Sequence, residues 1–122
     1  AEKVHNLGSD TLTVALTNTA PNATDATLSQ ITEISYTNCS SRALTTSASS
    51  QSSGTYKLVI TDLVLTASGG TVGPFRYVVI YNDTAASDQL IAYFDYGSSI
   101  TLAAGETFTL DFDASNGLLQ IA

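Results

Sequence analysis

The sequence predicts an all-β protein, an antiparallel, jelly-roll-like β-sandwich with a short N-terminal helical segment. Short stretches alternate between apolar and polar residues, and turn residues interrupt them about every 8 to 12 positions. Charged residues make up only 12% of the 122 residues, whereas Ser and Thr together number 33. Thr is β-branched and suits a pleated surface. The length fits one domain, so we expect a helical segment or arm at residues 1–8 and a single β-sandwich domain at residues 9–122.

The N-terminal segment has the pattern of a final helical turn. Val4 and Leu7 share one face at a spacing of three, and Gly8 follows where a C-terminal capping glycine is common. We expect the helix to begin before Ala1. Its apolar face, formed by Val4 and Leu7, is predicted to become ordered on a partner protein.

The first half of the domain contains one clear strand. Residues 11–17 alternate between Thr and aliphatic side chains, which predicts a half-buried strand. Residues 18–27 contain Pro21 and several turn formers and predict a long loop. Residues 31–36 alternate weakly, and residues 42–50 are typical of a polar edge strand.

The second half predicts longer and more apolar strands. In residues 54–65 most apolar side chains occupy even-numbered positions before Thr61-Asp62 and odd-numbered positions after it. This change indicates either a β-bulge or a strand that passes between two sheets. Asn116-Gly117 predicts a hairpin turn before the last strand. Phe108, Leu110 and Phe112 are expected to face the interior. Further strands are predicted at residues 75–81 (central), 90–95, 100–102, 107–111 and 118–121.

The charge balance argues against two classes of partner. The net charge is −7, and the only cations are Lys3, Arg42, Lys57 and Arg76. Nucleic acids and anionic membranes are both recognised largely by clustered cations. No apolar run approaches the roughly 20 residues of a transmembrane helix. We therefore expect neither direct nucleic-acid binding nor a membrane contact.

The residues that usually carry catalysis are scarce. His5 is the only histidine, Cys39 is the only cysteine, and Trp is absent. A Ser-His-Asp or Cys-His arrangement would have to use His5, which lies in the expected helix. The acids of residues 111–117 alternate as in some calcium loops but lack the closing Glu. We expect no enzymatic activity, no metal and no cofactor.

The tyrosines allow two interpretations. Tyr77, Tyr81, Tyr93 and Tyr96 surround the most apolar strands. They either fill the margin of the core with their hydroxyls in water or form an aromatic patch for a protein or a sugar. For the second interpretation, Tyr93 and Tyr96 are the expected contact residues, together with Val4 and Leu7.

Several longer stretches resemble a known family. "HNLGSDTLTVALTNTAP", "ITEIS", "SSGTYKLVITDLVLTASGGTVGPFRYVVIYNDTA" and "DYGSSITLAAGETFTLDFDASNGLLQIA" are similar to small virion structural proteins of tailed bacteriophages. The resemblance covers most of the chain from His5 to Ala122. Residues 36–42 depart from the Gly-rich turn of that family.

This resemblance implies a capsid decoration (cement) protein on the outer surface of the virion. Such a protein binds the major capsid protein, stabilises the shell and self-associates as a dimer or trimer. Two alternatives remain open at this point: a minor tail or adsorption protein of the virion, and a carbohydrate-binding β-sandwich module.

Overall fold

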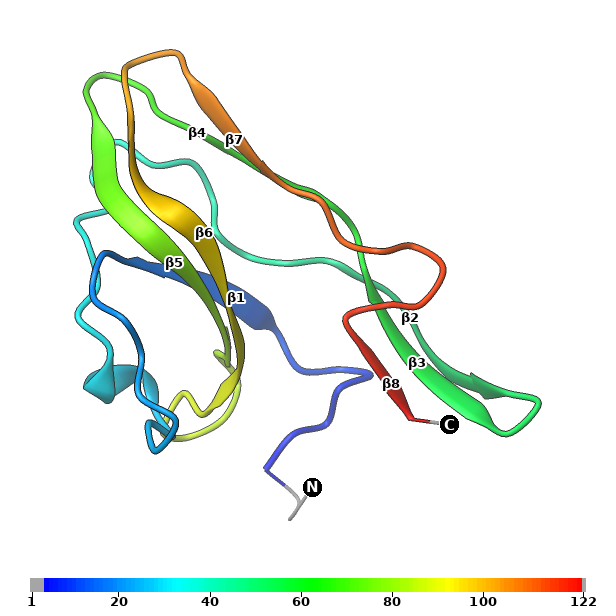
Figure 1. Ribbon diagram of the computed structural model, residues 1–122. Coiled ribbons are helices and arrows are strands. Elements are labelled where there is room, and N and C mark those ends of the chain that lie inside the picture. Colours follow the sequence, from blue (N-terminus) through cyan, green and yellow to red (C-terminus); the bar gives the residue numbers. More distant parts are fainter. Residues whose placement is uncertain (1–3, 122) are drawn as a thin grey trace.

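The protein is all-β in the computed structural model, which describes residues 4–121 (Figure 1). These residues contain eight strands, one 3-10 turn (Leu28–Gln30) and no α-helix. All pairings between strands are antiparallel, and the sheet orders are β1-β5-β6, β2-β3-β8 and β4-β7. The strands are β1 (Leu12–Thr17), β2 (Thr46–Ser52), β3 (Thr55–Ile60), β4 (Leu63–Thr66), β5 (Val72–Asn82), β6 (Leu90–Leu102), β7 (Thr107–Leu110) and β8 (Leu119–Ile121).

The predicted switch at Thr61-Asp62 is confirmed as a passage between two sheets. β3 pairs with β2 and β8, whereas β4, which follows directly, pairs with β7. Both switch residues make hydrogen bonds outside the strands: the Thr61 amide donates to the Thr45 carbonyl (2.9 Å), and the Asp62 carboxylate accepts from the Phe112 amide (2.8 Å). The two small sheets therefore form one continuous ribbon opposite β1-β5-β6 (Figure 1).

The core lies between this ribbon and the β1-β5-β6 sheet. Phe75 is fully buried there, and its ring meets the edge of Phe108 with 5.3 Å between centroids. The central position predicted for residues 75–81 is confirmed, because β5 lies between β1 and β6. The buried aliphatic residues of this cluster come from both layers and include Leu12, Val14, Leu16, Leu58, Ile60, Leu65, Val72 and Ile80.

β1 is buried on both faces, so the prediction of a half-buried strand is wrong. Every residue from Leu12 to Thr17 is buried. The second face is covered because Ala15 packs with Val79 and Tyr81, against which Leu28 and Ile31 lie. The Thr alternation that indicated a solvated face is misleading, since a Thr hydroxyl can be buried when it forms a hydrogen bond, as Thr17 does with Thr19.

The expected N-terminal helix is absent from residues 4–8, which form bends and turns instead. The Asn6 carbonyl accepts hydrogen bonds from the Ser9 and Asp10 amides, and the Asp10 carboxylate accepts from the Asn6 amide (2.7 Å). The amide and the carbonyl of Asn6 are therefore paired within this turn rather than in a helix. The remainder of the expected helix, residues 1–3, lies outside the described residues.

Two predictions about the C-terminal half are also wrong. The separate strands expected at residues 90–95 and 100–102 are one strand, β6, with an irregularity between them: Asp95 pairs with Tyr77, but Ile100 pairs with Phe75. The Asn116-Gly117 turn closes no hairpin, because β7 pairs with β4 and β8 pairs with β3. The turn residues were recognised correctly, but the strands that they connect belong to different sheets.

Candidate protein-binding surface

Three aromatic side chains within four positions of β6 lie at the surface. Tyr93, Phe94 and Tyr96 are 50%, 46% and 58% exposed. Side chains alternate along a strand, so Phe94 faces the side of the core and Tyr93 the opposite side. Tyr93 and Tyr96 therefore do not form the single tyrosine patch that the sequence suggested. Phe94 was missed, because it shares a face with Tyr96 only if the strand expected at residues 90–95 continues through Tyr96, as β6 does.

Phe94 and Tyr96 line a groove of about 240 Å³ between β6 and β7. Tyr96 and Phe108 pack edge to face with 5.4 Å between ring centroids, and the apolar wall continues with Leu110 at the end of β7 and with Phe112 beyond it. The prediction that Phe108, Leu110 and Phe112 face inward is confirmed in part, since all three are half-buried and pack against the core.

The groove is open because the strands on its two sides are sheet edges. In the described part of the chain, β6 pairs only with β5 and β7 pairs only with β4. The side chains that would meet across a closed layer therefore remain accessible. An unpaired strand edge also presents free backbone N–H and C=O groups to a partner.

Two carboxylates, Asp95 and Asp111, line the groove, and the first of them is neutralised within the chain. Arg76 on β5 donates two hydrogen bonds to the Asp95 carboxylate, at 2.8 and 3.0 Å. The Gly97 amide donates a third (2.7 Å). The hydrogen bond from Arg76 and then that from Gly97 lower the pKa of Asp95. Because the Asp95 carboxylate is already paired, Asp111 is the one charge of the lining that a covering partner would have to accommodate.

Tyr93 lies on the other face of β6, in a different setting. Its ring meets Tyr77 at 6.4 Å between centroids, with 62° between the planes. It borders a hollow of about 150 Å³ that is also lined by Pro21, Asn22 and Asp25 of the long loop. An aromatic ring beside amide and carboxylate groups offers both stacking and hydrogen bonding to a small polar ligand.

The N-terminal candidates are divided between surface and interior. Val4 is exposed, whereas Leu7 is half-buried and packs against the main core. His5, next to Val4, has its Nδ1 3.0 Å from the Asn82 amide nitrogen, and that nitrogen also donates to Asp10. This network ties the N-terminal turn to the end of β5.

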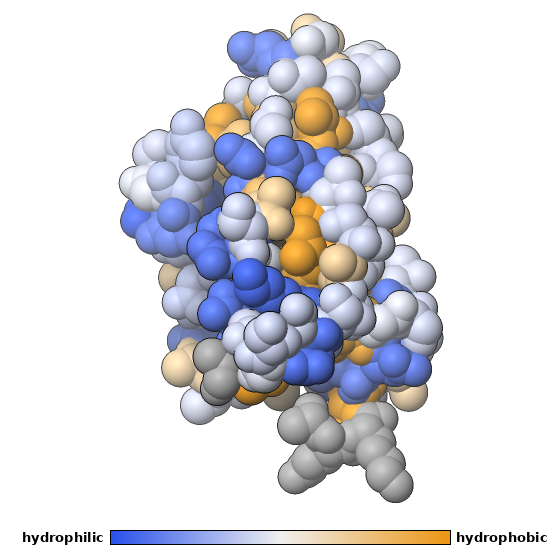
Figure 2. Space-filling model, turned by 90° about the vertical axis from the view of Figure 1, so that its right-hand side faces the viewer, coloured by the Kyte–Doolittle hydropathy of each residue, from blue (hydrophilic) through white to orange (hydrophobic). Residues whose placement is uncertain are grey.

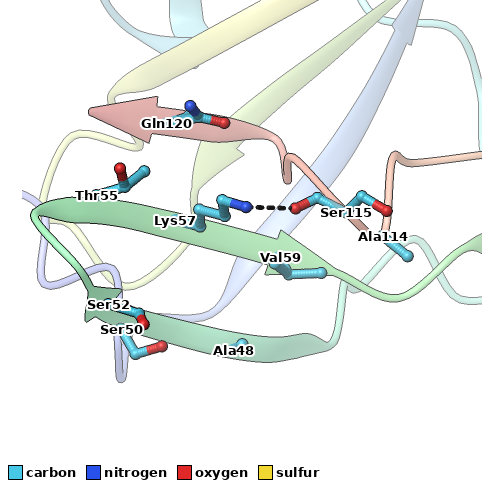
Figure 3. A pocket seen from close by; sticks show the side chains of 9 residues that line it. All are labelled: Ala48, Ser50, Ser52, Thr55, Lys57, Val59, Ala114, Ser115 and Gln120. Carbon is cyan, nitrogen blue, oxygen red and sulfur yellow. Dashed lines mark hydrogen bonds between the residues drawn. The ribbon is translucent and has the colours of Figure 1, made fainter. Parts of the chain in front are cut away.

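A second hollow, of about 430 Å³, lies on the outer face of β2-β3-β8 (Figure 3). Lys57 of β3 crosses its floor and donates a hydrogen bond to the Ser115 carbonyl (2.8 Å). The other side chains that line it are uncharged: Ala48, Ser50, Ser52, Thr55, Val59, Ala114, Ser115 and Gln120. Figure 2 shows this side of the molecule as a mostly pale surface with separate small apolar patches.

The residues considered for catalysis or metal binding have structural roles. Burial raises the pKa of the Cys39 thiol, and Cys39 forms a β-bridge with Ala67. The Asp113 carboxylate accepts hydrogen bonds from the Ser115 and Asn116 amides (2.7 and 3.0 Å), so it closes its own turn. Residues 4–121 contain no group of three or more His, Cys, Asp or Glu side chains placed to hold a metal ion.

No protein-family model, no curated protein and no solved structure matches this chain. None of the helical segments in residues 4–121 has the length and apolarity that crossing a membrane requires. The geometry of the surface is therefore the basis for a functional proposal.

Proposed function

We propose that this protein is a non-enzymatic structural component of a bacteriophage virion, a decoration protein that binds the major capsid protein on the outer capsid surface. The observation that carries the proposal is the aromatic groove formed by Phe94, Tyr96 and Phe108 on an open strand edge. Aromatic side chains are enriched in protein–protein interfaces, and charged side chains are depleted from interface centres. The resemblance to small virion proteins is the reason for proposing the capsid as the binding partner.

The architecture is consistent with this role. We infer that the β1-β5-β6 sheet and the ribbon opposite it form a jelly-roll-like β-sandwich, with the main hydrophobic core between them. Such a module is rigid, and its outer face around Lys57 presents hydroxyls rather than charges. A surface of this kind can be covered by another protein at a small cost in desolvation.

The test is the copy number of the protein in purified particles, measured by quantitative mass spectrometry against the major capsid protein. A ratio near one, or a simple fraction such as about a third, is expected for a decoration protein because capsid symmetry fixes the number of sites. A ratio below about one in fifty would replace this proposal with a tail or adsorption role. Absence from particles would overturn it.

A variant pair links the copy number to the groove. Tyr96→Ala removes an aromatic ring that is 58% exposed, and Val64→Ala is the matched control on β4, 50% exposed and outside the groove lining. We expect reduced occupancy for Tyr96→Ala only. Equal occupancy for both variants would exclude the groove as the attachment surface.

Carbohydrate binding is a second candidate, favoured by the hollow beside Tyr93. Its Asn22 and Asp25 side chains supply polar groups next to a half-exposed ring. Binding to an oligosaccharide on a glycan array that is abolished by Tyr93→Ala would support it. Silence across the array, with unchanged tyrosine fluorescence on titration, would exclude it.

A further inference from the structure

We propose that the free edge of β6 pairs with β6 of a second copy of this chain, antiparallel, with a two-fold axis at Phe94. This inference rests on the proposed protein-binding role of the groove and divides its two walls: the second copy covers the β6 wall at Phe94 and Tyr96, and the β7 wall stays available to the capsid protein. It is carried by the length of the free edge, by the self-complementary order of its side chains and by its charge.

The free edge is well delimited. At its start, the Leu90 amide donates to the Ala26 carbonyl (2.9 Å), and Thr27 forms a β-bridge with Gln89. At its end, the Gly97 amide is bound by the Asp95 carboxylate, and the register with β5 becomes irregular. Residues 91–96 between these points have a strand neighbour on one side only.

The middle of this edge lacks the features that usually prevent strands from pairing between molecules. Natural edge strands are protected by Lys and other charges, by Pro, by β-bulges or by a covering segment. β6 contains neither Lys nor Pro, its one charged side chain, Asp95, is paired with Arg76, and its irregularities of register with β5 lie outside residues 92–95. The edge of β1, at the opposite side of the same sheet, is covered by bridges from Glu33 and Ala43. Only the β6 side of this sheet is left open within residues 4–121.

The order of residues along the edge is self-complementary. A two-fold axis at Phe94 places Ala92 opposite Tyr96 of the second copy, so a small side chain faces a large one on the groove side. On the other side, Tyr93 lies opposite Asp95 of the second copy, so a hydroxyl donor faces a carboxylate. No carboxylate faces another carboxylate in this register.

The charge distribution predicts how the pairing depends on salt. Each chain carries a net charge of −7, so two copies repel one another over a distance. At the edge itself, Asp95 is paired with Arg76. Added salt screens the long-range repulsion and leaves the apolar contacts of Phe94 and Tyr96 intact. A basic protein partner would show the opposite dependence, because salt weakens attraction between opposite charges.

Sedimentation velocity of the full chain tests the proposal, at chain concentrations from about 1 µM to about 1 mM and at about 10 and about 500 mM NaCl. We expect a monomer–dimer equilibrium whose dimer fraction rises with salt. Phe94→Lys places a charge on the axis and should weaken association at least about tenfold. Val64→Lys is the control on another exposed strand and should leave association unchanged.

Amide hydrogen exchange of the unmodified chain identifies the surface even if Phe94→Lys fails to fold. Exchange of residues 92–96 should slow as the chain concentration rises, while exchange in β2 stays constant. A monomer at all concentrations, a trimer, a dimer weakened by salt, or equal effects of both Lys variants would each overturn the proposal. Copy number distinguishes the two proposals: a monomer that is abundant in particles overturns only the pairing, and a dimer that is absent from particles overturns only the virion role.

Discussion

Asn82 joins three segments of the chain through one buried amide. It is fully buried at the end of β5, and its side-chain nitrogen lies 2.7 Å from the Asp10 carboxylate and 3.0 Å from His5 Nδ1. Its side-chain oxygen accepts from the Thr84 and Ala85 amides. The same side chain therefore holds the N-terminal turn and shapes the loop after β5.

Replacing this amide should be costly. Asn82→Ala removes the four hydrogen bonds of this amide, to Asp10, His5, Thr84 and Ala85, and each contributes about 0.5–1.5 kcal/mol. We expect a loss of about 3 kcal/mol in the free energy of unfolding, measured by urea denaturation. Asn22→Ala, at an exposed site, should change it by less than about 0.5 kcal/mol. Similar losses for the two variants would contradict the role given to Asn82.

Asp113 makes stability depend on pH in the acid range. Hydrogen bonds from the Asn116 amide and side chain, and then from the Ser115 amide, lower its pKa in the folded protein. A lowered folded-state pKa stabilises the protein above the unfolded value of about 3.9, and this stabilisation is lost as the pH falls through the folded pKa.

Asp113→Asn keeps a hydrogen-bond acceptor but removes the titration. We expect it to be less stable than the parent protein at pH 7, with the difference shrinking as the pH is lowered toward 2. Thermal unfolding midpoints measured across this range check the sign. A difference that is constant with pH would show that the carboxylate charge is irrelevant to the turn.

Among the elements, β8 depends on a close approach that only glycine allows. Gly117 has a φ of +82°, and a Cβ at this position would collide with the Leu58 carbonyl oxygen. That carbonyl accepts the hydrogen bond from the Leu118 amide that brings the chain onto β3 (2.7 Å). The glycine is therefore required both by the backbone angle and by the neighbouring strand.

Two alanine variants separate these requirements. Gly105 has a φ of +90° but open space around it, so Gly105→Ala should cost only the backbone strain of about 1 kcal/mol. Gly117→Ala adds the collision, and we expect at least about 2 kcal/mol together with faster amide exchange in residues 119–121. Equal losses for the two variants would mean that β8 moves aside without cost.

The positions of the strands could be predicted from the sequence better than the pairing between them. The alternation in residues 54–65 and 107–111 reports one exposed and one buried face, and it located β3, β4 and β7. The pairing of β8 with β3 rather than with β7 depends on contacts more than 55 positions apart, such as Leu58 with Leu119, which local patterns do not encode. The helix expected near Val4 does not form, because the Asn6 amide is bound by the Asp10 carboxylate and the His5 ring by the Asn82 side chain.

Only part of the candidate surface could be predicted from the sequence. Tyr93 and Tyr96 were recognisable as aromatic residues on an apolar strand, but their separation onto two faces required knowing that β6 is continuous. Phe94 resembled a core residue because nothing in the sequence marks β6 as an edge. Whether a strand has one neighbour or two is a property of the whole fold.

For the whole molecule, the shared core predicts a single unfolding transition. Leu65 of β4 is fully buried in a cluster that also contains residues of β1, β3 and β5. Leu65→Ala should lower the free energy of unfolding by about 2–5 kcal/mol. Tyrosine fluorescence and far-ultraviolet circular dichroism should still report the same midpoint, because neither layer can remain folded without the other.

The neighbouring residue provides the control. Val64→Ala, half exposed on the same strand, should cost less than about 1 kcal/mol. Two separate transitions in Leu65→Ala would mean that the β4-β7 ribbon folds independently of the β1-β5-β6 sheet.

The order of pairings along the chain also bears on its synthesis. β1 can pair with β5 only after Asn82, the partner of Leu12, has been synthesised. β3 can pair with its second neighbour, β8, only after Ile121, the partner of Tyr56, has been synthesised. β3 therefore lacks its second neighbour until Ile121 has emerged from the ribosome. Contacts this distant in sequence are typical of chains that fold in milliseconds to seconds. During that interval, the aromatic strand β6 is exposed on each newly synthesised molecule.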